Sequence, residues 1–230
     1  MSLDAELCWG FHDQVTMPAD RIAAPRASWR FLTALFEKHE ITAPWAVVGH
    51  LCLDGCDGTH ADHPCEEAWF SRDPGGVMTA DSRWFAPRLV TNIRDSAVGH
   101  DIGLHAFSHV EFGAKATTPA IADAELHHGV TAVDRLGITP VSFVFPRNNV
   151  GHRSLLAARG FTCYRGLRPD RWYDTSPVPG VETLAKGATY AVGSSPPIVS
   201  PAVDDTGLVN IPASLFLFSF GGIPQRVAER

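Results

Sequence analysis

Two histidines four residues apart are the feature of the sequence with the clearest chemical meaning. His105 ends an apolar run and His109 follows it, and imidazoles at this spacing can face one metal ion. Asp13 follows another apolar run near the N-terminus. Two histidines and one carboxylate leave a coordination position open for water, as in catalytic zinc sites. We therefore predict that Asp13, His105 and His109 hold a divalent ion. The alternative is that Asp13 caps a turn and the histidines are ordinary loop residues.

Short apolar runs that alternate with helical patterns indicate which elements position these residues. We expect strands over 6–11, 45–48, 101–105, 141–145, 161–165 and 208–211. Helical patterns fall at 28–39, 87–96, 118–136 and 153–158. Parallel strands need such helical crossovers, so the sequence predicts an α/β fold, either a doubly wound sheet or a β/α barrel.

The ends of the expected strands carry the remaining reactive side chains. His12 and Asp13 come after the first strand, Arg147 after the fourth, and Arg165 at the end of the fifth. In both candidate folds chemistry gathers at the carboxyl ends of the strands. We therefore expect these side chains to lie near the histidine pair.

Length and composition indicate one globular domain over residues 1–230. The chain is 45% hydrophobic and carries a formal net charge of −6, which argues against nucleic acid as a partner. No apolar run is long enough to span a membrane, and residues 215–220 form the longest. The five cysteines are odd in number and no secretory signal is visible, so we expect a reduced, cytoplasmic compartment.

The segment around the histidine pair resembles a known family. Residues 99–109 are similar to the second motif of the polysaccharide deacetylases (carbohydrate esterase family four, the NodB homology domain), in which a strand leads into a metal-binding histidine motif. Residues 11–13 resemble the first motif, 42–49 the second strand, and 143–147 the third motif. The resemblance covers roughly residues 6–166.

This resemblance implies a distorted β/α barrel that removes N- or O-linked acetyl groups from a polysaccharide or its precursor. About six strands are recognisable, and the last strand of the family barrel is missing. Either the chain is truncated or residues 215–220 supply the extra strand. The ion held by Asp13, His105 and His109 would be zinc, with cobalt, manganese or nickel as alternatives. It would polarise the acyl carbonyl and activate water.

The resemblance also implies roles for two arginines. The backbone N–H of Arg147 corresponds to the family's oxyanion donor. The guanidinium of Arg147 or Arg165 could add positive charge there. The alternative for Arg147 is a simple ion pair with a carboxylate at the rim.

Several positions depart from the family pattern. His12 stands where the family has its general-base aspartate, so it acts as the base, serves as a fourth ligand, or marks a member that has lost hydrolysis. Ala106 replaces a hydroxyl residue, and Trp172 only loosely matches the fourth motif. No histidine follows His152, so the family's late general acid is absent.

The long polar loop over residues 50–80 holds a second group of metal-ligand residue types: Cys52, Cys56, His60, His63 and Cys65. They could bind a structural zinc, but we favour a loop that lies over the rim and contacts carbohydrate. The residues expected to contact substrate are His63, Trp69, Arg165 and Trp172. Trp69 could instead be a core residue.

Two other functions remain open from the sequence. The first is an amidohydrolase of the same fold that acts on a small non-sugar amide. The second is a non-catalytic glycan-binding barrel, which the histidine at position 12 and the missing late histidine would suit.

Overall fold

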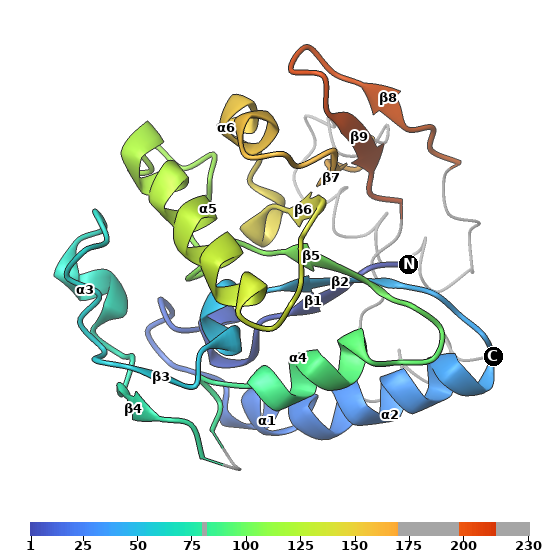
Figure 1. Cartoon of the computed structure of the whole chain (residues 1–230). Helices are drawn as coiled ribbons and strands as arrows, with labels where there is room; N and C mark the ends of the chain where they lie inside the picture. The colour runs from blue at the N-terminus through green and yellow to red at the C-terminus, as the bar shows by residue number, and fades with distance from the viewer. Residues whose placement is uncertain (80–81, 170–197, 215–230) are drawn as a thin grey trace, which may run out of the picture.

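The computed structural model describes residues 1–79, 82–169 and 198–214. A seven-stranded sheet forms its centre, in the order β1-β2-β5-β6-β7-β9-β8 (Figure 1). Every neighbouring pair is parallel except β8 with β9. The strands are β1 (Leu3–Ala5), β2 (Pro44–Val47), β5 (Asp101–Leu104), β6 (Ser142–Val144), β7 (Cys163–Gly166), β8 (Ala202–Val203) and β9 (Val209–Pro212). Two further short strands, β3 (Gly55–Cys56) and β4 (Gly76–Val77), pair with each other.

Helices connect the parallel strands and cover the sheet from two sides (Figure 1). They are α1 (Ala19–Ala23), α2 (Pro25–Lys38), α3 (Glu67–Phe70), α4 (Pro87–Arg94), α5 (Pro119–Asp134) and α6 (Arg153–Ala158). Short 3-10 helices follow three strands: η1 (Leu7–Gly10), η2 (Gly49–Cys52) and η3 (Pro146–Asn148). Helices α2 and α4 run side by side on one side of the sheet, with α5 and α6 on the other. The segment with β3, α3 and β4 projects beyond the sheet.

Sequence periodicity located most of these elements. Helix α5 begins as expected, because the Thr118 hydroxyl accepts a hydrogen bond from the Ile121 amide and Pro119 occupies the first turn. On α2, Trp29 and Phe36 turn inward against Trp45 of β2, with ring centroids 6.2 and 6.3 Å apart. These contacts bury the apolar face that the sequence pattern predicted.

The first strand is the element that sequence placed wrongly. Residues 6–11 do not form a strand: β1 ends at Ala5, and the run from Leu7 to Gly10 is a buried 3-10 helix. A short apolar run that is buried on all sides has no periodicity that separates strand from helix. The correction matters because Glu6 becomes the first residue after β1.

The sheet is strongly curled, as the predicted distorted barrel requires. Arg165 of β7 donates to both carboxylate oxygens of Asp4 in β1, at 2.7 and 2.8 Å. Three strands separate β1 from β7 in the sheet order. In a flat sheet that separation would be about 19 Å, too far for these two side chains to meet. The fold is therefore α/β with a barrel-like sheet. Among the described residues β1 pairs with one strand only, so the barrel is not closed there.

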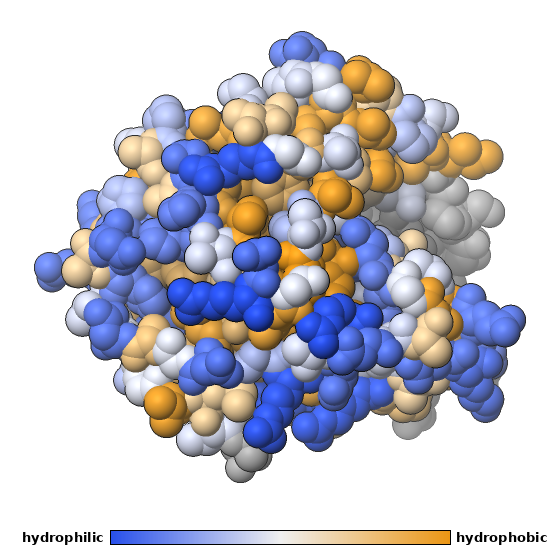
Figure 2. Space-filling model, viewed as in Figure 1, coloured by the Kyte–Doolittle hydropathy of each residue, from blue (hydrophilic) through white to orange (hydrophobic). Residues whose placement is uncertain are grey.

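One sequence expectation concerns the C-terminal end of the chain. The extra strand at 215–220 lies outside the described residues. Within the described part, no helix is long and apolar enough to cross a membrane. Figure 2 shows hydrophilic side chains over much of one face, with apolar ones gathered toward the upper right, around β8 and β9. Val203 and Ile211 are exposed on these strands.

Candidate metal centre

Glu6, His105 and His109 meet where β1 and β5 end. The Nε2 atoms of His109 and His105 lie 3.0 and 3.5 Å from Oε2 of Glu6. The two imidazole side chains are only 3% and 1% exposed, whereas the glutamate side chain is 27% exposed. One carboxylate and two imidazoles therefore form a group that opens to solvent on the carboxylate side, which is the character of a catalytic rather than a structural metal site.

The His105 ring is held in the tautomer that metal binding requires. Its Nδ1 lies 2.7 Å from the carbonyl oxygen of Val144, which can only accept a hydrogen bond, so Nδ1 carries the proton. In the neutral ring Nε2 then presents a lone pair toward Glu6. Histidines that bind metals are commonly oriented by such a bond from the other ring nitrogen. The donor set therefore fits a divalent cation.

The charges of this group are coupled. Burial acts to raise the pKa of Glu6, but hydrogen bonds and positive charge from His105 and His109 outweigh it and bring the pKa well below its usual range. Burial also acts to lower the pKa of both histidines. For His109 burial is the largest effect and the pKa is lowered. For His105 the hydrogen bond to Glu6 and the charges of Asp4 and Glu6 outweigh burial and raise the pKa. The carboxylate is thus ionised and ready to serve as a ligand.

Asp13, the carboxylate expected beside the histidines, stands elsewhere. Its Oδ1 lies 2.5 Å from Nη2 of Arg147, and the other end of that guanidinium lies 2.8 Å from Glu111. The pKa of Asp13 is lowered because the hydrogen bond from Arg147 outweighs the effect of burial. The structure brings Glu6 to the histidine pair and joins Asp13 to Arg147, since β1 ends at Ala5, eight residues before Asp13.

His12 presents a free ring nitrogen in a buried position. Its Nδ1 lies 2.7 Å from the carbonyl oxygen of Trp9 and must be the protonated nitrogen, while Nε2 is buried without a hydrogen-bond partner. Burial lowers the pKa of His12, with His109 among the nearby charges. His12 lies outside the compact set formed by Glu6, His105 and His109.

Backbone strain concentrates at the same strand ends. Ala106 and His109 after β5 have φ of 60° and 67°, and Arg147 and Asn148 after β6 have φ of 51° and 55°. Residues other than glycine rarely adopt this left-handed conformation, and in folded proteins it clusters at functional sites.

The residues expected to contact substrate have different surroundings. Trp69 packs edge-on against His12 with centroids 4.5 Å apart and donates from Nε1 to the Ser108 hydroxyl at 2.8 Å. His63 is buried beside Glu125, and Arg165 binds Asp4 at the wall of the curled sheet. Trp172 lies outside the described residues. Of the members of this set that the structure describes, Trp69 is the one that packs directly against His12.

The second group of cysteines and histidines is divided by the fold. Cys56 and His60 join His50 and Asp73, whereas His63 and Cys65 join Glu125. Cys52 belongs to neither set and packs in the hydrophobic core. The sequence analysis missed His50, six residues before Cys56, and Asp73, 13 residues after His60, because both lie in a segment without regular periodicity.

Glu6 was also missed, although a signal for it was present. The rule that active residues follow the strands would have selected Glu6 if the first strand had been ended at Ala5.

No protein-family model matches the chain, and no curated protein matches it either. Solved structures do match. A protein from Mycobacterium smegmatis assigned as a polysaccharide deacetylase aligns with 96% of this chain and 63% of its own, with a TM-score of 0.55 and 16% identity. The fold is that of a polysaccharide deacetylase.

A second solved structure matches with a lower score. The Streptococcus pyogenes deacetylase PplD, in complex with acetate, aligns with 73% of this chain at a TM-score of 0.46 and 9% identity. The chain spans 63% of the Mycobacterium protein and 54% of PplD. The comparison with the Mycobacterium structure confirms, at the level of fold, the resemblance carried by residues 99–109.

Proposed function

We propose that the protein is a metal-dependent hydrolase that removes N- or O-linked acetyl groups from a polysaccharide or its precursor. The observation that carries this proposal is the group of Glu6, His105 and His109, open on the carboxylate side, at the strand ends of a polysaccharide deacetylase fold. Active sites of barrel-like α/β folds lie at this end of the strands.

Glu6, His105 and His109 would hold the divalent ion, with zinc the best match to two imidazoles and a carboxylate. When bound, the ion would supply Lewis acidity to an acyl oxygen and a lowered pKa for water. The Val144 carbonyl keeps the Nε2 lone pair of His105 directed at the centre.

His12 would be the general base. Its Nε2 lone pair has no competing partner among the described residues, and the Trp9 carbonyl fixes the tautomer that leaves this nitrogen unprotonated. The proton of the attacking water would pass to this nitrogen. Such a base does not require the aspartate that the family has at this position.

Arg147 and Trp69 would complete the site. The Arg147 side chain is held between Asp13 and Glu111, so its backbone N–H is the better candidate to stabilise the oxyanion. Asp13 then acts by fixing Arg147. Trp69, which packs on His12, offers an aromatic face for a sugar ring.

The test is acetate release from acetylated chito-oligosaccharides by purified, zinc-loaded protein. We expect turnover in the wild type and its loss in Glu6→Gln and His105→Ala. The matched controls Glu40→Gln and His127→Ala alter exposed residues and should remain active. Glycan binding without turnover in the wild type would overturn the hydrolase proposal and favour the glycan-binding alternative.

A further inference from the structure

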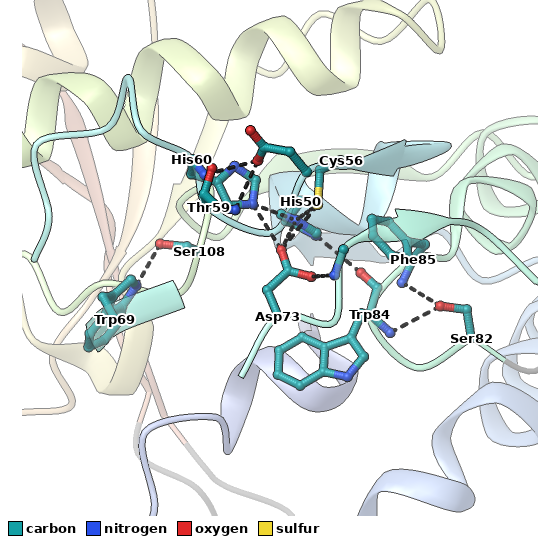
Figure 3. A network of polar contacts seen from close by, with 12 residues as sticks. His50, Cys56, Thr59, His60, Trp69, Asp73, Ser82, Trp84, Phe85 and Ser108 are labelled. Carbon is teal, nitrogen blue, oxygen red and sulfur yellow. Dashed lines mark hydrogen bonds and ion pairs between the residues drawn. The ribbon is translucent and has the colours of Figure 1, made fainter. Parts of the chain in front are cut away.

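Four metal-ligand side chains from separate segments converge in the projecting part of the molecule (Figure 3). His50 lies in η2, Cys56 in β3, His60 in the loop that follows, and Asp73 beyond α3. Nε2 of His50 and Nε2 of His60 are 2.8 and 2.9 Å from Oδ2 of Asp73 and 3.2 Å from each other. The Cys56 sulfur is 3.2 Å from the same oxygen and 3.5 Å from His50 Nε2.

These separations are close to those of a tetrahedral zinc site. With ordinary zinc bond lengths, two nitrogen ligands stand about 3.3 Å apart and a nitrogen and a sulfur about 3.6 Å apart. The observed nitrogen–nitrogen and nitrogen–sulfur distances are 3.2 and 3.5 Å. The contacts of His50, His60 and Cys56 to Oδ2 of Asp73, at 2.8, 2.9 and 3.2 Å, are shorter than these separations.

The position of the ring proton of His50 favours a cation at the centre of this cluster. Nδ1 of His50 lies 3.2 Å from the carbonyl oxygen of Trp84, so the proton of the neutral ring is on Nδ1 (Figure 3). Nε2 then directs a lone pair at the Asp73 oxygen and at His60. The lone pair of His50 Nε2 and the negative charge of Asp73 repel each other. A metal ion bound between these atoms would replace the repulsion with coordination. The alternative is a doubly protonated His50 in a buried ion pair with Asp73.

The surroundings are closed and largely apolar. The side chains of His50 and Asp73 are fully buried, and that of His60 is 10% exposed. Aromatic rings surround the two imidazoles: Trp9 and Phe85 lie 4.4 and 5.1 Å from His50, and Phe70 lies 4.5 Å from His60. Four protein ligands in a closed setting are typical of a structural zinc rather than a catalytic one.

The neighbouring group of His63, Cys65 and Glu125 offers three ligand atoms rather than four. The Cys65 amide donates to Nδ1 of His63 at 3.2 Å, so the ring proton is on Nε2, which lies 3.2 Å from Glu125 but is buried without a hydrogen-bond partner among the described residues. Glu125 accepts from the amides of Phe107 and Ser108 at 2.8 Å each. Because Nε2 of His63 carries the proton, it offers no lone pair to an ion, in contrast with Nε2 of His50.

We propose that His50, Cys56, His60 and Asp73 bind a zinc ion that anchors the segment from η2 to β4 onto the barrel. The soft thiolate and the two imidazoles favour zinc among the common divalent ions. On binding, the Cys56 thiol loses its proton to solvent. The inference does not rest on the proposed hydrolase activity, because none of these ligands belongs to the group at Glu6.

The experiment uses metal analysis together with cobalt substitution of the full chain. We expect about two zinc equivalents per wild-type chain, one for each centre. Only the second centre contains sulfur, so the cobalt-loaded protein should show a near-ultraviolet thiolate-to-cobalt charge-transfer band. Cys56→Ser should lose the band and one equivalent. His105→Ala should lose one equivalent and keep the band.

Cys65→Ser is the matched control, since it removes a nearby cysteine of the hydrogen-bonded group, and it should keep both the band and two equivalents. Cobalt protein without the band, or a band that survives Cys56→Ser, would overturn the proposal.

A second measurement uses the wild-type protein alone, so its result does not depend on whether a variant folds. Chelation should make Cys56 react faster with iodoacetamide while Cys163 is unchanged, and equal reactivity of Cys56 with and without metal contradicts the site.

Discussion

The indole of Trp9 packs against the imidazole of His50 with ring centroids 4.4 Å apart, and the carbonyl oxygen of the same tryptophan holds His12. Trp9 therefore stands between the proposed structural zinc and the proposed base. The segment that the zinc would anchor also carries Trp69, which packs on His12 from another side. Direct packing through Trp9 and Trp69 therefore connects the proposed zinc site with His12.

This coupling predicts a loss of activity when the second centre is broken. Asp73→Asn should lower kcat/KM for acetate release by about ten-fold to a hundred-fold, the range seen when residues that orient metal ligands are removed. Steady-state kinetics with zinc in excess measure the change. Asp123→Asn, an exposed surface carboxylate paired with Arg159, serves as control. Unchanged kcat/KM in Asp73→Asn would contradict the coupling.

Zinc binding by two variants distinguishes whether Glu6 or Asp13 is the carboxylate ligand beside His105 and His109. Glu6→Gln should weaken metal binding by more than about a hundred-fold, because a ligand is lost rather than a residue that orients one. Asp13→Asn should keep the metal, since Asp13 is bound to Arg147. Equilibrium dialysis with zinc separates the two. Metal loss in Asp13→Asn together with retention in Glu6→Gln would support the ligand set expected from sequence.

The pH dependence of the reaction should report His12. Burial lowers the pKa of His12 below 6.5, so the neutral form that acts as a base persists to more acidic pH. We expect the acid limb of kcat/KM to have an apparent pKa below 6.5 in the wild type. His12→Gln should remove that limb and slow the reaction by about a hundred-fold to ten-thousand-fold. An acid limb that survives in His12→Gln would assign the ionisation to another group.

The contact between Asp4 and Arg165 should contribute to stability. Asp4→Asn leaves a mostly buried guanidinium without its anionic partner, and we expect a loss of about 1.5–3 kcal/mol in the free energy of unfolding. Urea denaturation measures this. The exposed pair of Arg94 and Asp95 is the control, and Asp95→Asn should cost at most about 1 kcal/mol. Equal effects of the two substitutions would remove the special role of the contact across the curled sheet.

Local sequence determined the α/β character of the protein and the positions of most elements. Helical periodicity marked α2 and α5, apolar runs marked β2, β5, β6, β7 and β9, and the spacing of His105 and His109 marked one side of the candidate metal centre. These features depend on neighbours within a few residues, so the pattern along the chain is sufficient to predict them.

Only the tertiary structure decided which other side chains complete each centre. Glu6 rather than Asp13 stands by the histidines because β1 ends at Ala5, and a buried apolar run does not reveal that end. Cys56 and His63 belong to different groups because the loop folds back on itself, bringing Asp73 to one and Glu125 to the other. The tautomers of the buried histidines depend on contacts such as that of His105 with Val144. Such contacts join residues tens of positions apart, and no local pattern in the sequence encodes them.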